Sequence, residues 1–256
     1  MKLVVIALLC LFAGACSQQG IVDRFAPAAE VKFARSTLED LRLGHLDSTR
    51  NHLVAKLRNA DTDAELARMA DYFPKGAPRS VKTVGSSKMW MNGESRVSLA
   101  FEYEFESGWA VADMVVSTTG DQYAIEGLHV YRMKQSLEQT NAFTLRGKSP
   151  LQYLFLGMAC LVPLLCLYAL VLCARTPMRG RKWPWILFIL FGFATVGLNW
   201  TTGAFSMQPI SILLFGAACT AQPYGPWMIS VAFPLGAVWF LLKRRSYIAA
   251  MPPPLS

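Results

Sequence analysis

The apolar positions in the first part of the chain recur every three or four residues up to about residue 73. This spacing predicts an amphipathic helix near the start of the segment and a second one over residues 47–57. A third helix is predicted to begin at Thr62, because Thr62 and Glu65 have the spacing of a capping box. The apolar stripe of the first helix consists of Val31, Ala34, Leu38 and Leu41, and His45 continues it.

Beyond residue 80 the apolar period changes to two. In residues 96–106, apolar side chains occupy every second position from Val97 to Phe105, and mostly polar side chains lie between them. This alternation predicts an antiparallel strand with one apolar and one solvated face. Three helices followed by four strands predict an α+β domain with a curved antiparallel sheet wrapped on its first helix. Turn residues separate the other three predicted strands, at residues 81–91, 109–117 and 122–132.

The order of these elements, with GWAVADMVVSTTGDQYAIEGLHVY as the closing hairpin, resembles the NTF2-like superfamily of cone-shaped α+β domains, particularly its small exported members of unassigned activity. The resemblance covers residues 25–133. It rests on an aromatic-led strand, a Gly-Asp turn and a strand containing Ile-x-Gly. It implies an NTF2-like domain of three helices and four strands. Relatives with this fold include isomerases and dehydratases as well as binding or dimerising modules, so the resemblance implies no single activity.

A catalytic version of such a domain needs an acid or base in the cone pocket. The candidates are Asp113 and His129, which belong to neighbouring predicted strands, and Tyr103. Strand parity places His129 on the same side as Tyr123, Ile125 and Tyr131. The alternative is that Asp113 and His129 lie on the solvated face or make ordinary hydrogen bonds. The sequence contains no hydrolase, metalloprotease, nucleotide-binding or dinucleotide-binding motif, so we expect no cofactor, no metal and no catalysis.

The first residues of the chain have the composition of an export signal. Residues 1–15 combine one lysine, an uncharged apolar stretch and a small-residue site ending at Ala15. The apolar stretch reaches about 20 Å as a helix, less than the roughly 30 Å of a membrane core, which disfavours a permanent span. The AGAC sequence ending at Cys16 resembles the lipobox of bacterial lipoproteins, although Ala13 replaces the usual leucine. Lipidation of Cys16 and simple cleavage after Ala15 are both open, and residues 16–24 form a tether in either case.

The second half of the chain is dominated by uncharged apolar residues. Residues 151–173 carry no charge, and the sixty residues 183–242 contain no Asp, Glu, Lys, Arg or His. Because a charge in mid-membrane is disfavoured by about 2.5 to 3.5 kcal/mol, such runs predict membrane spans. We expect three rather than four spans, because a fourth would move the final basic cluster to the outer side. The predicted parts are a linker at 134–150, transmembrane helices at 151–173, 184–200 and 226–242, a cytoplasmic loop at 174–183, an outer loop with a re-entrant or interfacial segment at 201–225, and a cytoplasmic tail at 243–256.

The distribution of charge along the chain supports an orientation with the first domain outside the cytoplasm and the loop 174–183 and the tail inside it. The chain is 53% hydrophobic and 16% charged with a net charge of +8. All 17 acidic residues lie between Asp23 and Glu138 together with 17 basic ones, so the basic excess borders the apolar segments. Such an excess is typical of cytoplasmic loops and excludes a nucleic-acid footprint, which needs a basic face on a folded domain. The sequence therefore predicts a multi-pass protein of the bacterial cytoplasmic membrane, with its N-terminal domain outside and its C-terminus inside.

The expected function follows from this arrangement. We expect a membrane-anchored envelope protein whose exported domain binds a protein partner or a small ligand without catalysis. One alternative is an envelope isomerase or dehydratase that uses Asp113 and His129. A second alternative is a lipid- or solute-handling membrane subunit, for which residues 209–221 would line a cleft. The expected partners are the lipid bilayer and an envelope or membrane protein; the oligomeric state is left open.

Overall fold

The computed structural model describes residues 22, 24, 26–91, 94–120, 122–178 and 181–249. The predicted signal peptide and the candidate lipidation site Cys16 lie outside the described residues. The chain divides into two compact units, an N-terminal unit (Met1–Thr140) and a C-terminal unit (Asn141–Ser256). Each unit contains helices and one four-stranded antiparallel sheet. The predicted α+β class is confirmed.

Helices begin the described part of the N-terminal unit, and the long helix predicted from the apolar stripe is α3. The helix predicted over residues 47–57 is shorter, because the backbone of Leu53 leaves the helix and forms a bridge with Ile125. The predicted capping box does not form. Thr62 begins the next helix, but its hydroxyl donates to the carbonyl of Leu57 instead. The elements are α3 (Ala28–Arg42), α4 (Leu46–His52), the 3-10 helix η1 (Ala55–Leu57) and α5 (Thr62–Tyr72).

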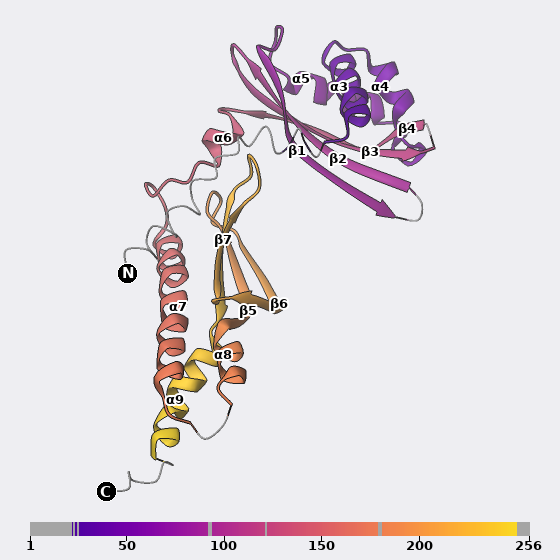
Figure 1. The fold of residues 1–256 in the computed structure, drawn as a ribbon. Helices are drawn as coiled ribbons and strands as arrows, with labels where there is room; N and C mark the ends of the chain where they lie inside the picture. The colour runs from indigo at the N-terminus through magenta and orange to yellow at the C-terminus, as the bar shows by residue number, and fades with distance from the viewer. Residues whose placement is uncertain are drawn as a thin grey trace, which may run out of the picture. The chain divides into compact units, whose positions relative to one another are not determined.

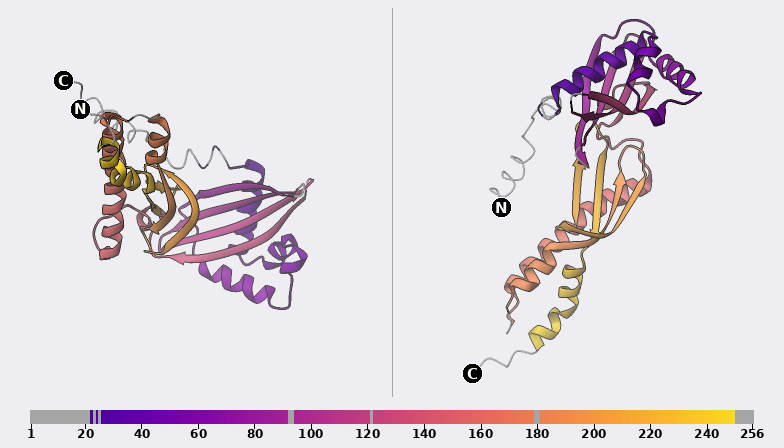
Figure 2. Two further views of the ribbon diagram at one scale, coloured as in Figure 1. Left: turned by 90° about the horizontal axis from the view of Figure 1, so that it is seen from below. Right: turned by 90° about the vertical axis from the view of Figure 1, so that its right-hand side faces the viewer.

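The sheet of the N-terminal unit is a meander in the order β1-β2-β3-β4, with every neighbouring pair antiparallel. Figures 1 and 2 show α3, α4 and α5 on one face of this curved sheet. The alternation predicted for β2 is confirmed, since its apolar positions are buried against the helices. The strands are β1 (Ser80–Met91), β2 (Glu94–Phe105), β3 (Gly108–Thr119) and β4 (Gln122–Met133). The core includes Ala34, Leu38, Leu41, Leu66, Leu99, Phe101, Tyr103, Met114 and Ile125.

The C-terminal unit begins with the 26-residue helix α7 (Pro150–Arg175). Its start is fixed by a capping box, in which Ser149 and Gln152 exchange side-chain and backbone hydrogen bonds. Among the described residues, α7 is the one helix long and apolar enough to cross a membrane, which is evidence by length and composition for membrane association. It coincides with the first predicted span.

The remaining predicted spans are not continuous helices. Residues 184–200 form a short helix followed by a strand, and residues 226–242 form a strand followed by a helix. The structure therefore does not show an all-α membrane region, and multi-pass topology is not supported. The elements are α8 (Trp183–Leu190), β5 (Phe191–Asn199), β6 (Phe205–Leu214), β7 (Ala217–Ala221), β8 (Trp227–Phe233) and α9 (Leu235–Ala249), with sheet order β6-β5-β8-β7.

The reason for this difference lies in two backbone positions. Pro234 lies between β8 and α9 and disfavours a helix continuing through this point, because proline lacks the backbone N–H that an interior helical residue donates; Pro163, by contrast, lies inside the continuous helix α7. Gly192 lies where the sheet backbone approaches closely, since a Cβ there would meet the Cα of Gly216 at 2.7 Å. An uncharged apolar run fits a buried strand as well as a helix, so composition alone did not separate the two.

Candidate functional site

The site residues predicted from the sequence lie on two different faces of the N-terminal sheet. Tyr103 is 2% exposed and packs with Phe73 and Phe105 in the core beneath the helices. Asp113 and His129 are directly opposite each other on β3 and β4, and both lie on the other face. The structure thus brings Asp113 and His129 together and leaves Tyr103 on the opposite side of the sheet.

A β-bulge in the β3–β4 pair decides which residues of β4 lie on the same sheet face as His129. The β3–β4 register shifts between Val115 and Val116, so Val115 pairs with Gly127 and Val116 with Ile125. The extra residue inverts the alternation along β4. Ile125 and Tyr123 therefore pack in the core, and the prediction that His129 shares their side is wrong.

A third residue, Tyr131, lies on the same sheet face as Asp113 and His129, two positions further along β4 than His129. Its side chain is hydrogen-bonded to Asp113, on the diagonal of the strand pair. Burial raises the pKa of Asp113, and the Tyr131 hydrogen bond and the nearby His129 oppose this rise. Burial and the adjacent Asp113 raise the pKa of Tyr131 to about 12. We call Asp113, His129 and Tyr131 the sheet-face cluster: a half-buried carboxyl with one phenol and one exposed imidazole.

Glu102 is a buried carboxyl on the same sheet face. It is 2% exposed, and its Oε2 accepts the backbone N–H of Leu137 at 2.5 Å, at the start of the short helix α6 (Leu137–Thr140). Burial raises the pKa of Glu102, while the Leu137 hydrogen bond and nearby Lys82 lower it. Glu102 therefore fixes the chain after β4 against the sheet and has a structural contact that accounts for its burial.

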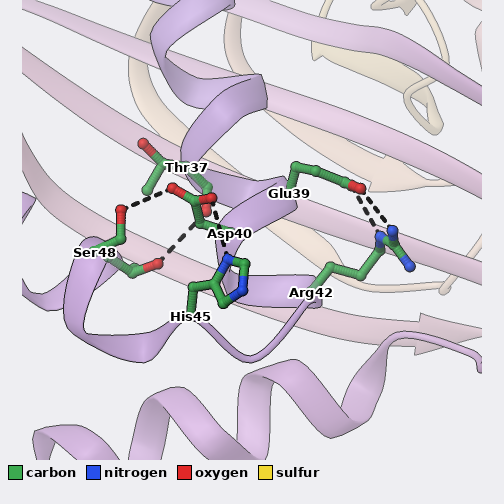
Figure 3. A network of polar contacts seen from close by, with 7 residues as sticks. Thr37, Glu39, Asp40, Arg42, His45 and Ser48 are labelled. Atoms are coloured by element: carbon green, nitrogen blue, oxygen red, sulfur yellow. Dashed lines mark hydrogen bonds and ion pairs between the residues drawn. The ribbon is translucent and has the colours of Figure 1, made fainter.

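A polar network lies at the junction of α3 and α4 (Figure 3). Ser48 donates to Oδ2 of Asp40 at 2.7 Å, and Nδ1 of His45 lies 3.6 Å from Oδ1 of the same carboxylate. A nucleophilic triad needs the histidine between the serine and the acid. Here the acid lies between Ser48 and His45, so the network does not activate Ser48. Its geometry instead fixes the turn between the helices.

Beside this network, Arg42 organises the ends of α3 and α5. Its guanidinium donates to both carboxylate oxygens of Glu39, at 2.9 and 2.6 Å, and to the carbonyl of Gly76 at 2.9 Å. The hydrogen bond from Arg42 lowers the pKa of Glu39. These contacts border a surface cleft of about 360 Å³. The cleft is lined by Arg42, Leu43, Gly44, Ala70, Asp71, Phe73, Pro74, Lys75 and Gly76.

The cleft combines an apolar wall with both signs of charge. Phe73 is buried and Leu43 is 54% exposed, while Arg42, Lys75 and Asp71 contribute charge to the same rim. Such a mixture suits an amphipathic ligand or a peptide side chain. Within the described ranges, no group of three or more His, Cys, Asp or Glu residues is placed to hold a metal ion.

Sequence reasoning gave Tyr131 no role, did not predict the burial of Glu102 and missed the cleft, each for a different reason. Alternation placed Tyr131 on the same side as His129, but only the register of β3 against β4 brings Tyr131 next to Asp113. Glu102 was one of an alternating acidic row, and nothing in the local sequence indicates that the chain near Leu137 covers it. The cleft is formed by residues 42–44 and 70–76, whose proximity depends on helix packing.

Comparisons with known proteins give no relative. No protein-family model, no curated protein and no solved structure matches this chain.

Proposed function

We propose that this chain is a membrane-anchored envelope protein whose N-terminal unit binds a protein partner or small ligand without catalysing a reaction. The observation that carries the proposal is the surface of α7. Leu154, Leu161 and Leu164 are between 58% and 65% exposed, in a helix without an internal charge. Exposed leucines along such a helix fit lipid and not water.

The orientation follows from charge. Basic residues gather after α7 and near the end of α9, and no acidic residue follows Glu138. Because basic loops stay in the cytoplasm, the N-terminal unit faces outward. In the same proposal this unit has an NTF2-like fold, which three helices packed on one face of a four-stranded meander support.

The cleft at Arg42 is the proposed binding site. It is open to solvent, and its rim carries charges with a wall of apolar side chains. The α3–α4 network and the Arg42 contacts hold this rim without ligand, so the site is preorganised.

A photo-cross-linking amino acid at Leu43 tests this site in intact cells. The matched control is Met89 on β1, which is 57% exposed against 54% for Leu43. We expect a discrete adduct from position 43 and none from position 89. Equal labelling at both positions, or none at 43, would contradict the proposed site.

The orientation needs its own test. Ser107 is exposed in the β2–β3 turn, so Ser107→Cys places a thiol on the N-terminal unit. We expect a membrane-impermeant thiol reagent to label it in intact spheroplasts. Labelling only after lysis would show that the unit faces inward.

The sheet-face cluster favours one second candidate, an isomerase or dehydratase. A half-buried Asp113 with a raised pKa, next to His129 and Tyr131, is an arrangement suited to proton transfer. Replacing Asp113 and His129 together by alanine distinguishes the candidates. Loss of the chain's cellular phenotype at normal membrane abundance would favour catalysis, and an unchanged phenotype would exclude it.

A further inference from the structure

One end of the C-terminal unit collects basic side chains that have no acidic partner. The cluster lies where the last turn of α7 meets the segment before α8 and the second half of α9. No Asp or Glu follows Glu138 in the sequence, so no acidic side chain of this unit can pair with these charges. We call this set the basic end: Arg175, Arg181, Lys182, Lys243, Arg244 and Arg245.

Side-chain contacts bring two of these residues, Lys182 and Arg244, to the end of α7. Nζ of Lys182 donates to the carbonyl of Ala174 at 2.8 Å, and Nε of Arg244 donates to Oγ1 of Thr176 at 3.2 Å. Both contacts are made at the last turn of α7, where the helix dipole is negative. Beneath them, Cys173 and Phe240 are fully buried, so packing holds α7 and α9 together.

The chemistry of the basic end suits phosphate. An arginine has several N–H donors in a planar fork, and Arg244 uses one of them on Thr176. In the described part of the chain, no other acceptor contacts its guanidinium. The cationic ends of Arg244 and its neighbours therefore lack a counter-ion that a phosphate group would supply.

Exposed apolar side chains border the basic end. Trp183 and Trp239 are 57% and 48% exposed, and Leu242 is 75% exposed next to Lys243. Nζ of Lys243 lies 5.3 Å from the centroid of the Trp239 ring. A nucleic acid or an acidic protein would not cover the leucine and tryptophan surface, whereas a lipid presents phosphate and hydrocarbon together.

The geometry points to a binding surface for the phosphate of anionic lipid headgroups at the basic end. The inference rests on the proposed membrane anchorage and adds a lipid class to it. Arg244 and Lys243 contact the headgroup phosphates, and Trp183 and Trp239 lie at the boundary with the acyl chains. The neutral-headgroup lipid phosphatidylcholine is bound less well, because its own trimethylammonium group offsets the phosphate charge.

The test uses the full chain in a mild non-ionic detergent, titrated with fluorescent phosphatidylglycerol or fluorescent phosphatidylcholine. The variant is Lys243→Gln/Arg244→Gln/Arg245→Gln. The control is Lys32→Gln/Lys56→Gln/Lys134→Gln, which removes three exposed charges from the N-terminal unit. Each neutralised cation near the lipid is expected to lower affinity about fivefold, so the variant should lose roughly a hundredfold in phosphatidylglycerol affinity. The control should bind like the unaltered chain.

Several results would overturn the proposal. The first two are equal affinity of the unaltered chain for the two lipids, and an equal loss of phosphatidylglycerol affinity in the variant and the control. The third is complete displacement of the lipid by inorganic phosphate at the same concentration. The fourth is single-stranded DNA that binds more tightly than the lipid and also loses affinity when residues 243–245 are replaced. If the triple variant does not fold, Arg244→Lys replaces it. This change keeps the charge, so most of the preference for phosphatidylglycerol should survive, and its loss would also count against the proposal. Failure of the anchorage itself would appear separately, as release of the unaltered chain from membranes by alkaline carbonate.

Discussion

The two units contain sheets of equal strand number but opposite surface character. In the N-terminal sheet, β2 buries nearly every second side chain against the helices, and polar groups lie between them. In the C-terminal sheet, β6 exposes almost its whole length, including Met207 at 71% and Ile210 at 99%. All the ion pairs found among the described residues lie in the N-terminal unit. The difference teaches that two antiparallel sheets with the same number of strands can expose opposite kinds of side chain, so strand topology alone does not predict the surface of a unit.

The edge of the C-terminal sheet sharpens this difference. An apolar edge strand is a template for pairing with other chains. Pro209 and the register shift opposite Phe193 and Thr195 interrupt β6 at its middle. These two features oppose continuous pairing of β6 with a strand of another chain.

The largest expected effect comes from the core of the N-terminal unit. Phe101 is fully buried on β2, so Phe101→Ala removes a ring that water never reaches. We expect the free energy of unfolding of this unit to fall by about 3 to 5 kcal/mol. Hydrogen exchange of the β2 amides in the full chain measures it. The control Met89→Ala changes an exposed side chain on β1 and should alter exchange little; equal effects would mean that β2 is not a core strand.

The next effect compares the same kind of change in the two units. Leu161→Arg places a charge near the middle of α7, and Leu43→Arg places one on the N-terminal unit, at sites 65% and 54% exposed. If α7 lies in lipid, the first change disfavours insertion by about 2.5 to 3.5 kcal/mol. The second is expected to shift stability by about 0.5 kcal/mol or less. The measurement is the fraction of each variant that resists alkaline carbonate extraction, and identical fractions would show that α7 is not membrane-embedded.

The units also differ in how much of their structure the sequence predicted. In the N-terminal unit, apolar residues recur every three or four positions in the helices and every second position in the strands. This difference predicted the two element types, because each element has one solvent-exposed face and one buried face. In the C-terminal unit most positions from 183 to 242 are apolar, so no period exists to separate strand from helix. Pro234 marks the break before α9, but Pro163 lies inside the continuous helix α7, so a proline alone did not decide between a break and a helix.

The candidate site was predictable only in part. The pairing of Asp113 with His129 follows from strand order, and both residues were identified. The bulge opposite Val115 was not, although Gly127 is the residue type that often marks such irregularities. The alternation along its strand already put Tyr103 on the apolar face, but the register of the neighbouring strands was not known, so the opposite face of Asp113 and His129 was not predicted.

A smaller effect distinguishes two carboxyls of the N-terminal unit by pH. Burial raises the pKa of Glu102, so its contribution to stability is present below the usual value of 4.5 and is lost as pH rises through the raised pKa. Arg42 lowers the pKa of Glu39, so that contribution is present above 4.5 and is lost as pH falls. Glu102→Gln keeps an acceptor for the Leu137 N–H and should leave the unit as stable as before, or more so, at pH 7.

The two glutamine variants should therefore change the pH dependence of the free energy of unfolding in opposite directions. Relative to the unaltered chain, Glu102→Gln gains most at the high end of the range from pH 4 to pH 7, and Glu39→Gln loses most there. Thermal unfolding of the N-terminal unit in the full chain across this range measures both. The same sign for the two variants would contradict the assigned causes of their pKa shifts.

The smallest expected effect concerns an exposed ion pair on the surface of the N-terminal unit. Nη2 of Arg79 lies 3.0 Å from Oε1 of Glu106, with side chains 60% and 88% exposed. Exposed pairs contribute about 0 to 1 kcal/mol, so Arg79→Ala should lower stability by about 0.5 kcal/mol or less. Comparing Arg79→Ala, Glu106→Ala and the double variant isolates the pair from other effects of each residue. We expect this coupling to vanish in 1 M salt, because the screening length there is about 3 Å. A coupling above about 1 kcal/mol that persists in salt would mean that water does not reach the pair, and that the N-terminal unit buries this surface against a partner.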